Sequence, residues 1–420
     1  MTPFLLSPAG KDYIWGGERL KTLFGKVSAL SPLAESWECS VHPDGPSQVA
    51  SGAFAGRSLA EVLAEHPEFL GDSPSAAGGL YILVKLIDAK RDLSVQVHPD
   101  DGYAFREEGG QQGKTEVWYV LDAEPGACLV FGLNRAATAE ELRLSLENGT
   151  FESLLRRVPV HRGDVFYIPS GTIHAIGGGI LLAEVQQNSN LTYRLYDYGR
   201  LGKDGRPREL HIDKALAVAD LSGAQPVRQP LRALRYRPGF VEELLCTGPN
   251  FRVSHCRLLA GPPAGDVGGT GDAGGDGFGA VGGGVGADGF GAAGGAAVIS
   301  VGDAGAASVT DVLLPALPES YRVLLCTDGA GVLSEGASAG SAEPASAAGV
   351  PDGAGVLSEG TSAGSAELAS AAGVPDDAGV LSEGAVAGTL RFRKGDTVFI
   401  PATAGPLALS GRAEFLLIRG

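Results

Sequence analysis

Two residues on one expected strand could bind a metal ion. Gln96 and His98 alternate with the apolar Val95 and Val97 in the segment Leu93–Asp101 (LSVQVHPDD). Such alternation predicts a β-strand, and successive side chains of a strand point to opposite faces. Gln96 and His98 are therefore expected on one face, where an amide oxygen and an imidazole nitrogen could both reach a metal.

A carboxylate and a second imidazole complete the candidate set. Glu116 ends the segment GKTE and begins an apolar run, and His174 ends RGDVFYIPSGTIH. The glycine and proline spacing before His174 resembles the second metal motif of cupin β-barrels, in which a tight turn at Gly171 delivers the histidine to the interior. A lone histidine is more often an ordinary core residue, but here three potential ligands accompany it. Two imidazoles, a carboxylate and an amide oxygen suit Zn²⁺ and tolerate Fe²⁺, Mn²⁺ or Co²⁺.

Charged side chains in neighbouring runs indicate an anionic substrate. Lys114 precedes Glu116 by two positions and Arg194 alternates with apolar residues in LTYRLYDY, so both are expected to face the interior. A buried cation is costly unless an anion pairs with it, and arginine suits phosphate. Lys85 is either a substrate contact or a lysine whose stem crosses apolar surface. Glu184 is either an acid–base group or the partner of a ligand histidine.

The composition excludes several classes of function. The chain has 420 residues, of which 44% are apolar and 20% charged, and its formal net charge is −16. This charge argues against binding to a nucleic-acid backbone, and neither a signal peptide nor a membrane span is expected. The five cysteines are scattered without CxxC spacing, so we expect reduced thiols and a cytoplasmic location. We also expect a monomer with no nucleic-acid or membrane partner.

Residues 1–233 have the pattern of a mixed globular sequence rich in short strands. Turn residues separate the runs, which is typical of a barrel or sandwich. Helices are expected over Leu59–Glu65, Ala139–Arg157 and Ile212–Leu221. The expected strands are Tyr81–Ala89, Leu93–His98, Glu116–Leu121, Cys128–Leu133, Asp164–Pro169 and Leu181–Gln186.

Two low-complexity insertions interrupt residues 234–420. One, at about 262–307, is rich in Gly and Ala. The other, at about 329–388, repeats GVLSEG with a period of 24 residues, at Gly331, Gly355 and Gly379. Neither insertion has enough large apolar residues to offset its chain entropy, so both are expected to be disordered loops.

The end of the chain echoes the second metal segment. Lys394–Pro406 (KGDTVFIPATAGP) matches Arg162–His174 at its Gly, Asp and Pro positions, but Pro406 stands where His174 does. Two copies of one barrel unit are implied, and the second lacks its metal histidine. We therefore predict a mainly β fold with a few short helices and two cupin-like jelly-roll barrels. Residues 1–233 would form the catalytic barrel, and residues 234–420 a degenerate one that carries the disordered insertions.

Six motifs resemble the type I mannose-6-phosphate isomerases, in particular their shorter bacterial form. They span about residues 1–215 in the family's order, whereas the C-terminal half resembles the family's second, degenerate domain only weakly. The motifs are IWGG from Ile14, AESWECSVHPDG from Ala34, VKLIDAKRDLSVQVHPDD from Val84, GKTEVWYVL from Gly113, IPSGTIHAIG from Ile168 and EVQQNSNLTYRLYDYGR from Glu184.

The resemblance implies an activity and a metal site. The family interconverts mannose 6-phosphate and fructose 6-phosphate with one zinc ion. Such an isomerisation moves a proton between C1 and C2 through an enediol, and a metal can polarise the substrate oxygens. Carried over to this chain, the zinc ligands are Gln96, His98, Glu116 and His174.

Further residues follow from the same resemblance. Lys114 and Arg194 fall in the family's active site, Glu184 is a third catalytic candidate, and the candidate substrate contacts are Lys85 and Ser94. Glu35 belongs to a family signature, for which we expect a structural role near the domain interface.

One departure from the family leaves the catalytic base open. Asn190 stands in a segment where the family commonly has Asp. If that Asp is the base, then Glu184, His98 or a metal-bound water replaces it here, or the protein is impaired. Two other classes of function therefore stay open: a metal-dependent cupin oxygenase, since two histidines and a carboxylate also hold Fe²⁺, and a non-catalytic cupin that binds sugar phosphates.

Overall fold

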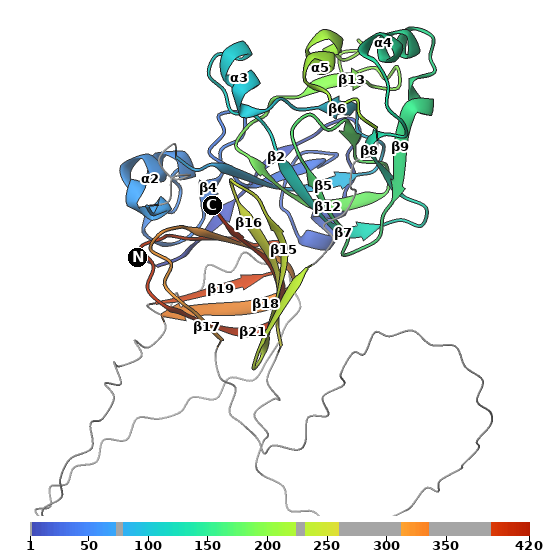
Figure 1. The fold of residues 1–420 in the computed structure, drawn as a ribbon. Coiled ribbons are helices and arrows are strands. Elements are labelled where there is room, and N and C mark those ends of the chain that lie inside the picture. The colour runs from blue at the N-terminus through green and yellow to red at the C-terminus, as the bar shows by residue number, and fades with distance from the viewer. Residues whose placement is uncertain (1, 73–78, 224–231, 260–311, 336–387) are drawn as a thin grey trace, which may run out of the picture.

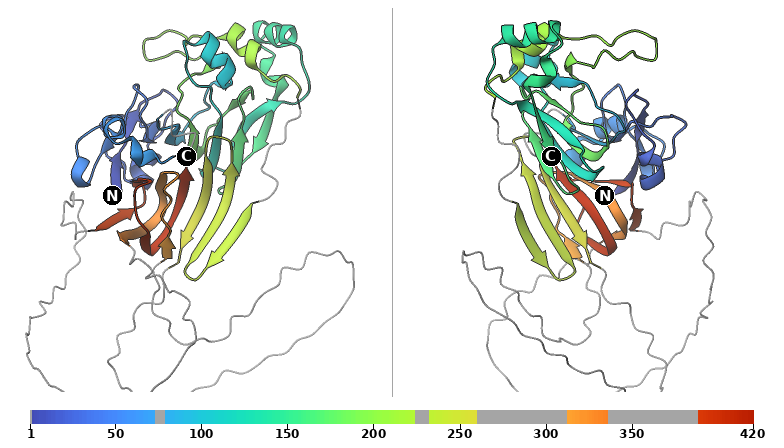
Figure 2. Two further views of the ribbon diagram at one scale, coloured as in Figure 1. Left: turned by 60° about the vertical axis from the view of Figure 1, so that its left-hand side comes forward. Right: turned by 90° about the vertical axis from the view of Figure 1, so that its right-hand side faces the viewer.

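The computed structural model describes residues 2–72, 79–223, 232–259, 312–335 and 388–420. The strands form two bodies that pack against each other, and both chain ends lie near their junction (Figures 1 and 2). The predicted fold class, mainly β with two cupin-like barrels and few short helices, is confirmed. The predicted disorder at about 262–307 concerns residues outside the described ranges. Within those ranges, no helix is long and apolar enough to cross a membrane.

Two antiparallel sheets form the first barrel. The six-stranded sheet contains β2 (Ala9–Lys11), β3 (Glu35–Cys39), β5 (Ile82–Ala89), β7 (Glu116–Ala123), β10 (Val165–Ile168) and β12 (Ile180–Gln187). The five-stranded sheet contains β6 (Val95–Val97), β8 (Cys128–Leu133), β9 (Leu155–Pro159), β11 (His174–Ala175) and β13 (Tyr193–Tyr196). The first sheet has the order β10-β7-β12-β5-β3-β2 and the second β13-β6-β11-β8-β9. The pairing of β6 with β11 therefore places two of the predicted metal segments side by side, and the third begins β7 in the other sheet.

Both faces of the six-stranded sheet are buried, as strand β7 shows. Trp118 and Val120 pack inside the first barrel, whereas Val117 and Leu121 pack in a core shared with the second barrel. A strand covered on both sides has a nearly continuous apolar sequence, which explains the run after Glu116. Glu116 shares the inward face with Trp118, because residues two apart on a strand point the same way.

The second barrel is built on one large antiparallel sheet. Its ten strands are β1 (Phe4–Ser7), β4 (Gln48–Val49), β14 (Ala233–Arg237), β15 (Phe240–Thr247), β16 (Arg252–Leu258), β17 (Val312–Leu314), β18 (Arg322–Glu335), β19 (Thr389–Arg393), β20 (Thr397–Ile400) and β21 (Leu407–Arg419). The first strand of the chain thus belongs to this sheet, since Phe4 pairs with Phe399. A domain boundary at residue 233 stays a prediction.

Five short helices surround the strands. They are α1 (Arg19–Phe24), α2 (Leu59–Glu65), α3 (Asp101–Glu107), α4 (Ala139–Glu147) and α5 (Ile212–Val218). Figure 1 shows α3, α4 and α5 at the end of the first barrel that lies away from the second barrel. Side-chain caps begin three of them: Ser58 starts α2, Asp100 starts α3 and Thr138 starts α4.

The helix predicted over Ala139–Arg157 is too long. Helix α4 ends at Glu147, and the next glycine, Gly149, has a φ of +69° that a continuing α-helix cannot accommodate. Leu155–Pro159 then forms strand β9. The apolar residues that suggested one long helix belong to a helix, a 3₁₀ turn and a strand.

Each barrel contains the same type of turn, as the similarity between Arg162–His174 and Lys394–Pro406 predicted. Gly163 and Gly395 have φ values of +87° and +89°, and strands β10 and β20 begin two residues later. In each turn the aspartate after the glycine accepts a backbone N–H bond, Asp164 from His161 and Asp396 from Arg393. The same local sequence therefore folds in the same way in both halves.

The start of the first repeat copy, residues 331–335, is part of the second barrel, which corrects one prediction. Residues 331–335 form the end of β18 and pair with both β19 and β21. Leu333 is 1% exposed, so a repeat residue fills the core. The backbone N–H of Glu335 donates to the carbonyl of Gly388 at 3.2 Å, so the chain leaves and re-enters the sheet at adjacent points. The later copies lie outside the described residues.

Deleting residues 337–384, two full repeat periods, should leave the barrel intact. The deletion joins Gly336 to Ala385 and keeps every residue of β18 and β19. A shorter flexible loop costs less closure entropy, by up to about 2 kcal/mol. We expect unchanged activity and an equal or higher melting temperature, measured by calorimetry.

The matched control removes one residue more, 331–379. Val380 then replaces Gly331, where an added Cβ would lie 2.5 Å from the ring of Phe392, and a serine takes the buried place of Leu333. A one-residue shift exchanges the two faces of a strand, so this variant should melt several degrees lower. Equal melting temperatures for the two deletions would contradict the assignment of this copy to β18.

Candidate metal and substrate site

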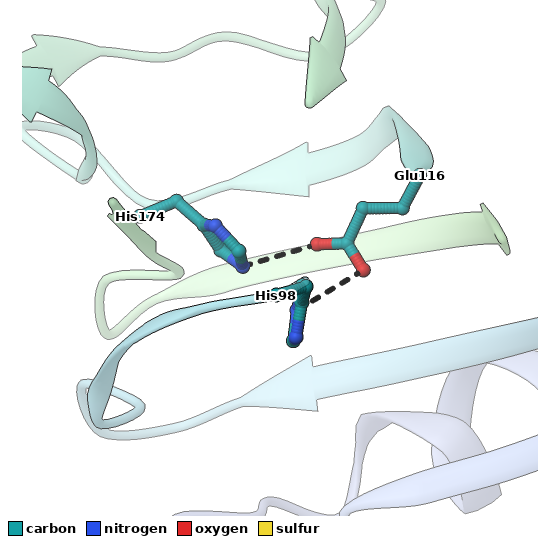
Figure 3. A group of neighbouring side chains, drawn as sticks. All are labelled: His98, Glu116 and His174. Atoms are coloured by element: carbon teal, nitrogen blue, oxygen red, sulfur yellow. Dashed lines mark ion pairs between the residues drawn. The ribbon is translucent and has the colours of Figure 1, made fainter. Parts of the chain in front are cut away.

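Three buried side chains meet inside the first barrel (Figure 3). His98 follows β6, Glu116 begins β7 and His174 begins β11. His174 Nε2 lies 3.2 Å from Glu116 Oε1, and His98 Nε2 lies 3.7 Å from Oε2. All three ligand atoms are within 4.8 Å of one another, a grouping found once in the described parts of the chain. The structure thus brings together three of the four predicted ligands.

Both imidazoles are oriented to offer a lone pair to this centre. His98 Nδ1 lies 2.7 Å from the carbonyl oxygen of Leu191, and His174 Nδ1 lies 2.8 Å from that of Thr172. A carbonyl only accepts, so each Nδ1 carries the proton and each Nε2 is free to bind a metal. Burial, with the nearby charge of Lys114, holds the pKa of His98 well below its usual value. His98 is therefore neutral, as a ligand must be.

Glu116 is an ionised carboxylate without a hydrogen bond. It is fully buried, and neither side-chain oxygen has a hydrogen-bond partner in the described structure. Burial opposes ionisation, but the charge of Lys114 at 3.2 Å is the main opposing influence, and the Glu116 pKa lies well below its usual range. A buried carboxylate with open coordination positions fits a divalent cation, which would satisfy both oxygens.

Two glycines allow the ligand segments to lie this close together. A Cβ on Gly113 would lie 2.4 Å from the backbone of Asp100, so only glycine lets GKTE pack against HPDD. Gly171 has a φ of +84°, and its N–H donates to the carbonyl of His98 at 2.8 Å. This bond ties the turn before His174 to the strand end that carries His98.

Strand pairing in the five-stranded sheet aligns two further side chains with His174. His174 on β11 is directly opposite Gln96 on β6, and Gln96 is opposite Arg194 on β13. Gln96 Nε2 lies 3.4 Å from His174 Nε2, and turning the amide by 180° would present its oxygen to the same centre. Arg194 Nε donates to Ser94 Oγ at 3.2 Å. Gln96 therefore links the metal side of the site to its cationic side.

A second row of paired side chains, like the row formed by His174, Gln96 and Arg194, crosses the six-stranded sheet. Lys85 on β5 is opposite Glu184 on β12, which is opposite Trp118 on β7. Lys85 Nζ lies 3.0 Å from Glu184 Oε1, and the Trp118 indole donates to Glu184 Oε2 at 2.9 Å. Burial disfavours the ammonium, but Glu184 and Glu35 outweigh it and raise the Lys85 pKa. Lys85 and Glu184 therefore form a charged pair held in one orientation.

The two rows face a pocket of about 280 Å³. Lys114 lies just before β7 rather than on the strand, yet its side chain reaches both the pocket and Glu116. The candidate catalytic and substrate-binding residues all line the pocket, as does Gln96. The lining residues are Tyr13, Trp15, Glu35, Lys85, Ile87, Leu93, Ser94, Gln96, Lys114, Ile176, Glu184, Asn190, Thr192, Arg194 and Arg208.

Several pocket residues were not found by sequence reasoning. Glu35 lines the pocket, accepts a hydrogen bond from Trp37 Nε1 at 2.7 Å and lies 3.9 Å from Lys85 Nζ, and its expected structural role near the domain interface stays a prediction. The feature that could have identified Glu35 is its charge at the start of a strand whose residues are all buried. Arg208 lies in a loop without alternation, so no periodic signal identified it.

Asn190, the residue that departs from the family pattern, lines the pocket. Its side-chain amide donates to Asp44 Oδ2 at 2.7 Å. Asp44 belongs to the HPDG segment after β3, 146 positions earlier in the chain. A carboxylate is thus present beside position 190, although it comes from a different segment.

Comparison of this sequence with known proteins identifies the family to which it is similar. Residues 4–115 match the model of the type I phosphomannose isomerase catalytic domain. The probable mannose-6-phosphate isomerase GmuF of Bacillus subtilis is 44% identical over 228 residues, which are 54% of this chain and 71% of that protein. ManA of the same organism, a mannose-6-phosphate isomerase, is 45% identical over 52% of this chain and 68% of its own length.

Solved structures agree with the sequence comparison. The crystal structure of mannose 6-phosphate isomerase from Bacillus subtilis matches with a TM-score of 0.70 and 27% identity, covering 100% of this chain and 99% of that one. A mutant of phosphomannose isomerase from Salmonella typhimurium, 15% identical, shares the fold with a TM-score of 0.61 over 100% of this chain and 99% of its own. With its buried His–Glu–His group and these relatives, the chain belongs to the type I phosphomannose isomerase family.

Proposed function

We propose that this protein is a zinc-dependent aldose–ketose isomerase that interconverts mannose 6-phosphate and fructose 6-phosphate. The observation that carries the proposal is a pocket whose wall contains both Lys114 and Gln96, which contact the His98–Glu116–His174 group, and a guanidinium, Arg194, to which no carboxylate of the described residues is hydrogen-bonded. The first feature suits a metal that binds sugar oxygens, and the second suits a phosphate. The relatives named as mannose-6-phosphate isomerases support the same substrate pair.

Gln96, His98, Glu116 and His174 would hold the zinc ion. The ligand set has nitrogen and oxygen donors and no thiolate, as in catalytic rather than structural zinc sites. When bound, the ion supplies a Lewis acid that polarises the sugar oxygens at C1 and C2. The two backbone carbonyls behind the imidazoles fix which ring nitrogen is available.

Glu184 is the proposed acid–base group that moves the proton between C1 and C2. Its carboxylate is 3% exposed, lines the pocket and has one oxygen, Oε1, without a hydrogen bond. The Trp118 indole holds the other oxygen, Oε2, and Lys85 Nζ lies 3.0 Å from Oε1, so the carboxylate is fixed in the pocket wall. A positioned base of this kind contributes about 10²- to 10⁴-fold to the rate.

The cations of the pocket have complementary proposed roles. Lys114 would stabilise the negative charge that develops on the enediolate, because it lines the pocket beside the ligands. Arg194 would orient the substrate through its anionic group, assisted by Ser94 and Lys85. This set of charges distinguishes the proposal from a cupin oxygenase, which needs Fe²⁺ and open coordination positions but no phosphate-binding end.

We further propose a cytoplasmic monomer. All five cysteines are free, and four of them are buried, which suits a reducing compartment.

A coupled assay tests the proposed reaction. The zinc-loaded protein should convert mannose 6-phosphate to fructose 6-phosphate, lose this activity on chelation and regain it when Zn²⁺ is restored. Oxygen uptake, measured in parallel with Fe²⁺, should be absent. No turnover in the reloaded protein, with sugar phosphate still bound, would favour a non-catalytic binding protein.

His174→Ala should abolish metal binding. Removal of one ligand should reduce zinc content to well below one ion per chain and activity by more than about 100-fold, while the circular dichroism spectrum stays unchanged. His161→Ala is the control, since the His161 side chain is 80% exposed and outside the pocket. Full zinc stoichiometry in His174→Ala would refute its role as a ligand.

Glu184→Gln should separate chemistry from binding. The amide keeps the shape of the side chain but cannot accept the proton, so kcat should fall by about 10²- to 10⁴-fold. Zinc content and the KM for mannose 6-phosphate should stay close to those of the parent protein. Glu124→Gln, an exposed residue outside the pocket, serves as the control. A kcat within threefold of the parent would exclude Glu184 as the base.

A further inference from the structure

Two arginines bind one buried carboxylate next to the pocket. Asp197 is 5% exposed, and its Oδ2 accepts a hydrogen bond from Arg208 Nε at 2.8 Å. Its Oδ1 accepts bonds from Arg208 Nη2 and from Arg200 Nη2. Paired bonds of this fork geometry fix a guanidinium in position as well as in charge. Arg208 is thereby held in the pocket wall, while Arg200 lies behind it on the carbonyl of Asp92.

A third arginine in the same cluster has no such partner. Arg194 Nε donates to Ser94 Oγ, and its Nη1 donates to the carbonyl oxygen of Glu209 at 2.8 Å. Burial, with the charge of Arg208, lowers the Arg194 pKa. The carboxylate of Glu209 gives little compensation, because it is 83% exposed, is screened by water and lies 3.8 Å from His211.

The charge of the pocket is therefore uneven. Lys85 and Lys114 each have a carboxylate within 3.2 Å. At the other end, Arg208 and Arg200 share the carboxylate of Asp197 and Arg194 has no bonded carboxylate among the described residues, which leaves about two positive charges uncompensated. Cations in a partly buried site are costly without an anion. A phosphate monoester carries a charge of about −1.5 to −2 at neutral pH, which matches this excess.

We propose that Arg208 and Arg194 together bind the substrate's phosphate as a dianion, and that Asp197 is the positioning residue that holds Arg208 for this contact. The inference rests on the proposed hexose-phosphate substrate and adds the charge state that the site selects. A phosphate monoester should bind better than the sulfate monoester of the same sugar, which has the same tetrahedral shape but only one negative charge.

Binding to the zinc-loaded full-length protein tests the subsite without turnover. The probes are mannitol 6-phosphate, mannitol 6-sulfate and mannitol, which have no carbonyl group and cannot isomerise. We expect calorimetry to show the phosphate ester binding most tightly. Arg208→Met should weaken it by about 10- to 100-fold, weaken the sulfate ester less and leave mannitol unaffected. Arg206→Met, an exposed residue of the same loop, should change none of the three affinities.

The role of Asp197 needs a separate readout. Asp197→Asn should raise the KM for mannose 6-phosphate while kcat stays within about twofold, and should lower the phosphate-to-sulfate affinity ratio. Asp197→Glu should restore part of that ratio. A lower melting temperature with an unchanged ratio would assign Asp197 to structure alone and overturn its positioning role.

The outcomes distinguish this inference from the proposed function. If Arg208→Met binds both esters as the parent does, or if the parent prefers neither ester, the subsite is wrong even though turnover of mannose 6-phosphate still supports the isomerase. If the parent shows the expected ratio but no turnover, the subsite stands and the isomerase is refuted.

Discussion

The buried carboxylate of Glu116 is the group on which the first barrel depends. A charge with no exposed surface and no hydrogen bond is tolerated because the ammonium of Lys114 lies 3.2 Å away and the two imidazole nitrogens complete a place for a cation. Strand alternation then fixes the rest of β7, with Trp118 on the side of the site and Val117 in the core between the barrels. A slip of one residue would exchange these faces and place valine at the metal centre.

Local patterns predicted the side chains that share a strand, and the tertiary fold decided which strands meet. Gln96 and His98 were identified by alternation and His174 by its turn, because these signals are local. The alignment of Lys85 with Glu184 depends on pairing between β5 and β12, which the sequence does not encode in any short window. Arg208 and Glu35 were missed for the same reason, since their partners lie in distant segments.

The relation between the barrels explains why, among the described residues, the candidate metal site lies in the first barrel. Equivalent glycine turns precede β10 and β20, but the chain after β20 leads to Pro406 rather than to a histidine. The second barrel instead contributes contacts. Glu38, displaced by an irregularity in β3, binds Lys26 and Thr397 and so connects the edge of the first barrel to β20. The candidate site thus lies in one barrel, and the other barrel packs against it.

The point where the chain leaves β18 and re-enters at β19 has a further consequence. Glu335 and Gly388 are hydrogen-bonded neighbours, so whatever connects them need only begin and end at the same place. Both belong to the second barrel, whereas the candidate metal ligands lie in the first. This junction is therefore a suitable insertion site. A reporter domain or an affinity tag could be inserted there without altering either chain terminus.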